Sequence, residues 1–417
     1  MGSGDNDSRA MWLQIKGAFW QGIGAGILMA IAFMAGFLYR QYVFAPPTSH
    51  TSFRLLSEID ALLEQYYLYE LPDEATRIHG AAKGLVASLN DPYTFFVEPQ
   101  TADVDATNLA GRFGGIGVEV TRDEEGHFVI ATVYPDNPAA EAGLMVGDII
   151  VAVDGVVMDT SAADMNQLLS AVRGEIGTPV TLTIQRGTQT FEVRLIRAEV
   201  LIPSTFWRVV EQDPRVGYIQ ITRFTERAPE EVRQAIAELH DQGVSAYVLD
   251  LRDNGGGLVD AAIRITGEFL DGGVVLYEQR TNGEQVYNAP RGGSALDAPL
   301  VVLINNGTAS AAEIVAGALQ DRGRAVLVGQ RSFGKGTVQT ILTLSDGSSV
   351  HITTAQWFTP GHHPIAAQGL TPDIAVEPAQ GEDTALLAAL EVLAAQLGQA
   401  RERVHRIGRV SSVMSFN

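Results

Sequence analysis

The chain has 417 residues, of which 46% are hydrophobic and 19% are charged, so it can form two or three domains with hydrophobic cores. Its 29 basic and 49 acidic residues give a formal net charge of −20, which argues against binding to nucleic acid. The chain has no cysteine, which excludes disulfides, cysteine nucleophiles and cysteine-bound metal ions.

The segment Gly17 to Tyr39 contains no charged residue and is long enough to cross a bilayer as a helix. A cleaved signal peptide has a shorter apolar region, and the best late cleavage site here, Ala45, is followed by Pro46 and Pro47. We therefore expect residues 1–45 to be a cytoplasmic tail and an uncleaved anchor, which makes the protein a single-pass membrane protein. Basic residues on both sides of the span give a weak orientation signal, and we expect the rest of the chain to lie in the cell envelope.

Residues 46–110 are expected to be a linker followed by a helical region. Apolar residues recur at helical spacing from Phe53 to Tyr67 and again from about Asp73 to Leu89, where the turn signal Asn90 to Thr94 follows. The two helices predict an arm or cap. Together with a last predicted helix in residues 381–417, they make a homodimer plausible.

Residues 111–199 have a different character. Strand patterns at Val118 to Val120, Phe128 to Val133 and Val180 to Ile184 surround a predicted helix from about Ala163 to Val172. With the loop Gly114 to Gly117, this ordered set resembles a PDZ domain of the bacterial, circularly permuted type.

A PDZ domain captures the end of a polypeptide, because free loop N–H groups hold the terminal carboxylate and a strand edge pairs with the peptide. The alternative is that Gly114 to Gly117 is only a turn that leads into a strand and binds no peptide. The residues expected to contact the peptide are Gly114, Gly115, Ile116, Gly117, Val118, Leu168 and Leu169.

Strand and helix patterns alternate through residues 200–380, which predicts an α/β domain. The predicted strands include 216–221, 245–251, 301–305 and 325–329, and the predicted helices include 228–239 and 258–270. Asp346 and Gly347 mark a hairpin turn between the strands 337–344 and 349–357.

Ser310 and Lys335 are the candidate catalytic pair of this domain. Ser310 follows a buried strand and a glycine-containing turn and begins a helix, where free N–H groups and the helix dipole are available. Lys335 lies on a glycine-flanked turn, and a lysine held in a dry pocket can lose its charge and act as a base. Ser-Lys pairs are a known variant of the Ser-His-Asp triad.

Three consecutive glycines, Gly255 to Gly257, follow the predicted strand 245–251. Glycines let the backbone approach a substrate closely. Their N–H groups, together with that of Ala311, are suited to an oxyanion hole.

Other readings of these residues are weaker. The run Gly329 to Lys335 imitates a phosphate-binding loop, but Gly336 stands where Ser or Thr is needed, and a strand rather than a helix follows. The eight histidines are scattered, and His362 and His363 have no clear set of further ligands, so we expect no metal and no cofactor. A triad that uses His351 has no supporting motif.

Taken together, the motifs resemble those of the carboxyl-terminal processing proteases, also called tail-specific proteases. The motifs are 250–257, 307–314, 332–339 and 90–94, with the PDZ-like segment between them. The resemblance implies a crotonase/Clp-like α/β core, with Ser310 as nucleophile, Lys335 as general base and Gln339 as the residue that orients Lys335. It also implies that Gly256 and Ala311 supply the oxyanion N–H groups. The family commonly has proline where Gly255 stands, which leaves open which glycine donates.

The leading hypothesis is a serine endopeptidase that selects proteins by their C-terminal tails and cleaves them through an acyl-enzyme. We expect the PDZ domain to bind the substrate tail and to gate activity, with the membrane helix as anchor. The alternative is a catalytically silent, membrane-anchored PDZ scaffold that binds protein C-termini. A latent protease whose PDZ domain blocks the site until a peptide binds is a third interpretation.

Overall fold

The computed structural model describes residues 53–158 and 165–398. The chain divides into two compact units, residues 1–81 and 82–417. The predicted anchor, Gly17 to Tyr39, lies outside the described residues. Among the helices of the described ranges, none is both long and apolar enough to span a membrane.

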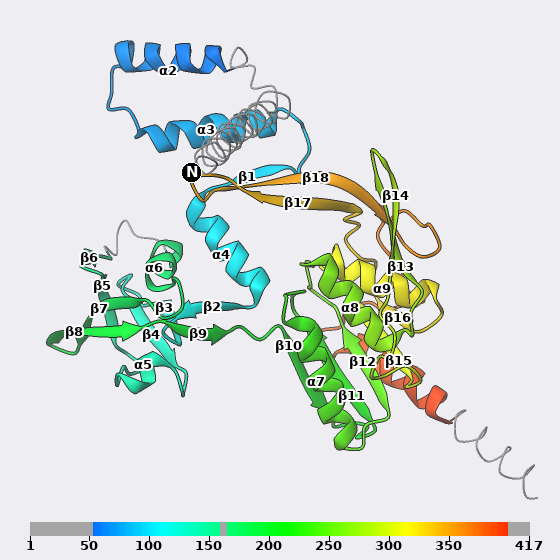
Figure 1. Cartoon of the computed structure of the whole chain (residues 1–417). Coiled ribbons are helices and arrows are strands. Elements are labelled where there is room, and N and C mark those ends of the chain that lie inside the picture. Colours follow the sequence, from blue (N-terminus) through cyan, green and yellow to red (C-terminus); the bar gives the residue numbers. More distant parts are fainter. Residues whose placement is uncertain (1–52, 159–164, 399–417) are drawn as a thin grey trace, which may run out of the picture. The chain divides into compact units, whose positions relative to one another are not determined.

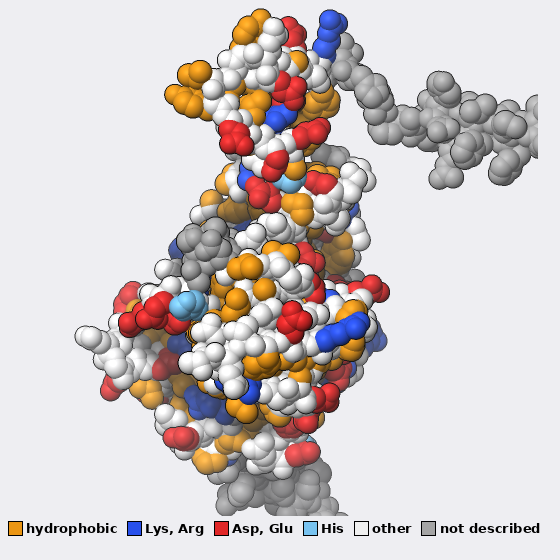
Figure 2. Space-filling view, turned by 90° about the vertical axis from the view of Figure 1, so that its left-hand side faces the viewer, with side chains coloured by type: hydrophobic (Ala, Val, Ile, Leu, Met, Phe, Trp, Pro, Cys, Tyr) orange, Lys and Arg blue, Asp and Glu red, His pale blue; other side chains and the backbone are white. Residues whose placement is uncertain are grey.

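The described part of the first unit consists of α2 (Arg54–Tyr66) and the beginning of α3 (Glu74–Ala87), as predicted. Arg77 links the two helices, because its guanidinium is 2.7 Å from Asp60 and 3.0 Å from Glu64. No residue of α2 is buried. Its apolar face therefore stays open, and Figure 2 shows hydrophobic side chains at the top of the view, where these helices lie. The exposed side chains include Leu55, Leu56, Ile59, Leu62 and Leu63.

The second unit contains a six-stranded sheet in the order β10-β11-β12-β15-β16-β19 (Figure 1). Its strands are β10 (Thr205–Val209), β11 (Val216–Ile221), β12 (Ala246–Asp250), β15 (Leu300–Ile304), β16 (Val326–Gly329) and β19 (Ile374–Ala375). All neighbours from β11 onward run parallel, and β10 is antiparallel to β11. A parallel sheet is covered on both faces, which explains why β12 and β15 are buried throughout.

Alternate residues of the central strands face two different layers. Leu249 and Val302 pack in one core with the helices α7 (Ala228–Asp241), α8 (Val259–Phe269) and α9 (Ala311–Asp321). Val248 and Val301 pack in another core with the C-terminal helix, residues 384–398. The sheet is therefore the middle layer between α7, α8 and α9 on one face and the C-terminal helix on the other.

A five-stranded antiparallel sheet also belongs to the second unit. It is ordered β1-β18-β13-β14, and β17 also pairs with β18. The strands are β1 (Phe95–Val97), β13 (Val274–Arg280), β14 (Gly283–Asn288), β17 (Thr337–Thr343) and β18 (Ser349–Phe358). β17 and β18 form the predicted hairpin, whereas β1 and the largely exposed β14 are edge strands that the sequence patterns did not indicate.

The PDZ-like segment forms its own sheet around a separate core. The sheet is ordered β3-β4-β5-β7-β8, with β6 on β5. Ile116, Phe128 and Leu168 are among the buried residues of its core. The elements are β3 (Val118–Arg122), β4 (Phe128–Val133), α5 (Pro138–Glu141), β5 (Ile149–Val153), β6 (Val156–Val157), α6 (Met165–Val172), β7 (Pro179–Arg186) and β8 (Gln189–Ile196).

Two short strands join the ends of this segment. α4 (Pro99–Ala110) leads into β2 (Arg112–Gly115), which pairs antiparallel with β9 (Ala198–Leu201). The Ile202 N–H donates to the Gly111 carbonyl at 2.9 Å, just beyond that ladder. The chain therefore enters and leaves the PDZ-like segment at neighbouring points.

Candidate active site

The turn that carries Ser310 joins the carboxyl end of β15 to the first residue of α9. Ser310 has φ 56° and ψ −119°, a region that residues with a side chain rarely occupy. A sharp turn of this kind between a strand and a helix presents the nucleophile above the sheet in α/β-hydrolases. Strain of this sort persists only where surrounding contacts hold it.

Hydrogen bonds to the loop after β12 hold this turn in place. The Thr308 hydroxyl donates to the Leu251 carbonyl at 2.8 Å, and the Ala309 N–H donates to the Asn254 carbonyl at 2.9 Å. Gly256 lies directly against Ser310, since a Cβ on Gly256 would be 2.8 Å from the Ser310 Cβ. Only glycine fits at position 256, because a side chain would collide with Ser310 and because the φ of Gly256 is +102°.

Glu313 lies in the first turn of α9 and its carboxylate is fully buried. Its Oε2 accepts the N–H groups of Ser310 and Lys335, both at 2.9 Å. Its Oε1 accepts the Ser332 hydroxyl at 2.5 Å and the Gly334 N–H at 2.8 Å. Burial raises the pKa of Glu313, and these four hydrogen bonds act against that shift. One carboxylate therefore connects the backbone of the candidate nucleophile to the backbone of the candidate base.

Lys335 is partly buried on the loop between β16 and β17. Burial lowers the pKa of its amine, while the charge of Glu313 acts in the opposite direction. The Trp357 indole donates to the Lys335 carbonyl at 2.9 Å, and the Lys335 Nζ lies 5.4 Å from the centre of the Tyr93 ring. The backbone of Tyr93 is held by Asp91, which accepts the Tyr93 N–H at 3.0 Å.

Ser310, Lys335 and Gln339 line one cavity of about 600 Å³, which we call the catalytic cavity. Gly255, Gly256 and Gly257 also line it, as do Leu258, Ile314 and Trp357. The structure thus brings the predicted residues together. Within the described ranges, no hydrogen bond joins the Ser310 hydroxyl to the Lys335 amine. The Gln339 amide donates to the Thr337 hydroxyl at 2.9 Å rather than to Lys335.

His351 also lies in the catalytic cavity, stacked on Phe95 with ring centres 4.5 Å apart. Burial lowers its pKa, so the ring is neutral at neutral pH. In the part of the chain that the structure describes, no hydrogen bond connects it to Ser310. The geometry therefore gives no support to a histidine triad.

The expected oxyanion donors differ in whether their N–H groups already make a hydrogen bond. The Gly256 N–H donates to the Asn254 Oδ1 at 2.8 Å, so in this structure that group is already engaged. The N–H groups of Gly255, Gly257 and Ala311 make no hydrogen bond within the described residues, and the Ala311 group lies at the free N-terminal end of α9. The assignment of Ala311 and Gly256 remains a prediction.

The predicted peptide-binding residues all belong to the PDZ-like domain. Gly114 and Gly115 lie in β2, paired with β9, and Val118 begins β3. Leu168 is fully buried in the domain core, whereas its neighbour Leu169 is partly exposed. The peptide-site assignment remains a prediction.

Among the described residues, one group of potential metal ligands is close together: Asp123, Glu125 and His127, at the turn between β3 and β4. Asp123 already accepts a hydrogen bond from the His127 backbone at 2.7 Å, and all three side chains are exposed or partly exposed. This turn is far along the chain from the catalytic residues and adds nothing to their chemistry.

Two families match this chain. Residues 215–376 match peptidase family S41, and residues 129–186 match the PDZ domain. The carboxy-terminal-processing protease of Bartonella bacilliformis is 38% identical over 317 residues, which cover 74% of this chain and 71% of that protein. The carboxyl-terminal-processing protease of Synechocystis sp. is 36% identical over 321 residues, covering 76% and 75%. The protease CtpA of Bacillus subtilis is 34% identical over 312 residues, covering 74% and 66%.

The chain therefore belongs to peptidase family S41, and it is a serine protease with a PDZ domain. This confirms the family resemblance, the mixed α/β fold and the enzyme class expected from the sequence motifs. The enzyme class also favours an active protease over the alternative of a catalytically silent scaffold.

Several residues of the site were not assigned from the sequence. Glu313 was only one letter of a motif, and an acidic residue in the first turn of a helix is usually explained by the helix dipole. Tyr93 and Asn254 belong to motifs as well, but their contacts join segments distant in sequence. Spacing alone cannot reveal such contacts.

We expect Glu313→Gln to lower kcat by about 10-fold or more, because displaced reacting groups cost up to about 10²-fold. An amide has one acceptor oxygen, so two of the four hydrogen bonds are lost whichever way it turns. The free energy of unfolding should fall by about 1–3 kcal/mol. Steady-state kinetics and thermal unfolding measure both effects.

Glu231→Gln is the matched control. Glu231 is also buried and accepts the Ser204 N–H and hydroxyl, but it does not line the catalytic cavity. This variant should lose stability and keep its kcat. An equal loss of kcat in both variants would show that the effect of Glu313 is global.

Proposed function

We propose that Ser310 is the nucleophile and Lys335 the general base of this protease. The observation that carries the proposal is the buried Glu313 carboxylate, which ties both residues to the same point beside the catalytic cavity. The lowered pKa of Lys335 supports a neutral amine that can accept a proton. Catalytic hydrogen bonds are often long in peptide-free enzymes and shorten when substrate binds.

The reaction proceeds in two halves. The Ser310 Oγ attacks the scissile carbonyl carbon while the Lys335 amine takes the hydroxyl proton. Lys335 then gives this proton to the leaving nitrogen, the C–N bond breaks and an acyl-enzyme forms. Water attacks the acyl carbon and loses a proton to Lys335. The proton returns to the Ser310 oxygen as the ester bond breaks and the new carboxyl terminus leaves.

The Ala311 N–H and one glycine N–H of the 255–257 loop stabilise the oxyanion of each tetrahedral intermediate. Ala311 is favoured by its position at the start of α9, where N–H groups lack partners within the helix. For Gly256 to serve, its N–H must leave Asn254, whereas Gly257 is unengaged. Gln339 orients the Lys335 amine once the substrate is bound, since both side chains line the catalytic cavity.

The substrates are proteins or peptides selected by their C-terminal tails. The names of the relatives from Bartonella bacilliformis and Synechocystis sp. describe carboxyl-terminal processing, and this chain has the same combination of protease and PDZ domain. The loop Gly114 to Gly117 holds the tail carboxylate, and the edge that begins at Val118 pairs with the tail. Tail binding gates activity in this proposal.

The segment Gly17 to Tyr39 anchors the protease in a membrane, with the catalytic part on the extracytoplasmic side. Support comes from its charge-free length and from relatives in bacteria and chloroplasts. The exposed apolar face of α2 is suited to contact with a second copy of the chain.

Ser310→Ala and Lys335→Ala should each reduce cleavage of an unfolded protein with an apolar C-terminus by at least about 10³-fold, as expected for members of a catalytic unit. Cleavage is followed by gel electrophoresis and mass spectrometry of the products. Both variants should unfold at the wild-type temperature, which serves as the control for folding. Wild-type cleavage rates in both variants would refute the dyad.

The rate should rise with pH through the pKa of Lys335, because only the neutral amine is a base. Burial places this midpoint below the ordinary lysine value of 10.5. Glu313→Gln removes a negative charge that favours the ammonium, so its midpoint should move to lower pH. Profiles of kcat/KM measure this shift, with Glu231→Gln as the unshifted control. A midpoint that stays in place or rises contradicts the assignment of Lys335.

Substrates that end in a carboxamide should have a KM about 10-fold higher than substrates with a free carboxylate, with a smaller change in kcat. The reason is that a hydrogen bond to a charged group contributes about 1.5–3 kcal/mol. A peptide pair that differs only at this terminus gives the comparison. Equal KM values would mean that the tail carboxylate is not recognised.

A further inference from the structure

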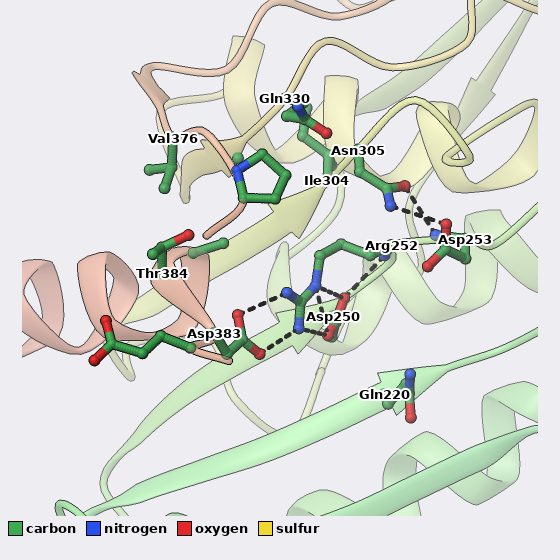
Figure 3. A pocket seen from close by; sticks show the side chains of 14 residues that line it. Gln220, Asp250, Arg252, Asp253, Ile304, Asn305, Gln330, Val376, Asp383 and Thr384 are labelled. Atoms are coloured by element: carbon green, nitrogen blue, oxygen red, sulfur yellow. Dashed lines mark hydrogen bonds and ion pairs between the residues drawn. The ribbon is translucent and has the colours of Figure 1, made fainter. Parts of the chain in front are cut away.

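A second cavity, of about 410 Å³, lies at the carboxyl edge of the six-stranded sheet (Figure 3). We call it the sheet-edge cavity. Asp253 belongs to its lining and also to the lining of the catalytic cavity. Residues 253–257, which contain the candidate oxyanion glycines, therefore have the catalytic serine on one side and this second cavity beside them. The lining residues that matter here are Asp250, Arg252, Asn305 and Asp383, all labelled in Figure 3.

Arg252 lies in this cavity between two carboxylates. Its Nε is 3.0 Å from both oxygens of Asp250, and its Nη2 is 2.6 Å from one of them. On the other side, Nη1 and Nη2 donate to the two oxygens of Asp383 at 2.8 and 2.9 Å. Asp250 is buried and also accepts the Tyr218 hydroxyl. Two-pronged pairs of this kind fix orientation as well as distance.

Asp383 is attached to a rigid element. It precedes the C-terminal helix, residues 384–398, and its Oδ1 accepts the Leu386 N–H at 3.0 Å, as an N-cap does. Ala385, Leu386 and Ala389 of that helix pack in the core on the sheet face opposite α9. The hydrogen bonds from Arg252 lower the pKa of Asp383 despite its partial burial, so the carboxylate stays charged.

Arg252 immediately precedes the loop that contacts the nucleophile. The next residue, Asp253, has φ 57° and exchanges two hydrogen bonds of 2.9 Å with Asn305. Gly256 then packs against the Ser310 Cβ. A displacement of Arg252 therefore moves the loop that faces the reacting carbonyl.

We infer that Arg252 is a positioning residue for catalysis, and that its ion pair with Asp383 makes the C-terminal helix a support for the oxyanion loop. This inference rests on the proposed role of Ser310 and of the loop 253–257. Arg252 touches neither the substrate nor the reacting atoms. It acts through the glycines that follow it.

The decisive variant is Asp383→Asn in the full chain. Asparagine caps a helix about as well as aspartate, so the C-terminal helix keeps its first hydrogen bond. The change removes the charge and one of the two acceptors for Arg252. Arg252→Lys is the second variant, because lysine keeps the positive charge and loses the two-pronged geometry.

Glu382→Gln is the matched control. Glu382 lines the same cavity, and its replacement by glutamine removes one negative charge, as Asp383→Asn does. Among the described residues, no hydrogen bond or ion pair joins Glu382 to Arg252. The readouts are kcat, KM, the rate at which a fluorophosphonate labels Ser310, the pH profile and the unfolding temperature. Ser310→Ala supplies the blank for labelling and cleavage.

Asp383→Asn and Arg252→Lys should each lower kcat and the labelling rate by about 10-fold, below the 10²–10³ expected for full loss of one oxyanion donor. KM should stay within about twofold of the wild-type value. The midpoint at which the rate rises with the pKa of Lys335 should not move. Glu382→Gln should behave as wild type. The double variant should lose little more than either single one, because the two residues act as one unit.

An unchanged kcat in Asp383→Asn overturns the inference, as does a loss that merely follows the fraction of unfolded protein. Cleavage that persists in Ser310→Ala is a different failure, since it removes the proposed nucleophile itself. The two failures are therefore distinguishable in the same set of measurements.

Discussion

The buried carboxylate of Glu313 is the interaction on which the active site depends. A charge that is removed from water is tolerated only when hydrogen bonds replace its hydration, and here four donors do so. Those donors come from the turn at Ser310 and from the loop that carries Lys335. The requirement to satisfy one charge thus brings two distant segments of the chain together, and it also holds Ser310 in a strained conformation.

The six-stranded sheet is the rigid element that positions the other loops of the active site. Its central strands are buried on both faces, so the loops at their carboxyl ends extend from a rigid base. Ser310, the glycines 255–257 and Arg252 all lie on such loops, where ligands of open α/β sheets bind. Lys335 comes from the segment before the hairpin β17–β18. The site therefore combines loops of one sheet with a lysine that precedes a hairpin of the other, and residues of both sheets pack in one shared core.

Patterns that reflect burial were predicted well from the sequence. The apolar run at β15, the helix α9 and the hairpin at Asp346 and Gly347 match the structure closely, because core contacts and turn chemistry determine them locally. The edge strands β1 and β14 were missed, since half-exposed strands have no such pattern. The link between Arg252 and Asp383 spans 131 residues, and the bond from Gly256 to Asn254 depends on a side-chain orientation. Neither contact can be predicted from the spacing of residues in the sequence.

The β2–β9 ladder has a consequence for how this chain is built. The PDZ domain leaves the protease part and returns to it at neighbouring points, which the short β2–β9 ladder joins. Phe128 packs in a core that shares no residue with the core beneath the sheet that carries Ser310, so a substitution there acts first on the PDZ domain. The PDZ domain and the protease part therefore each have a core of their own, and each can accept core substitutions that leave the packing of the other unchanged.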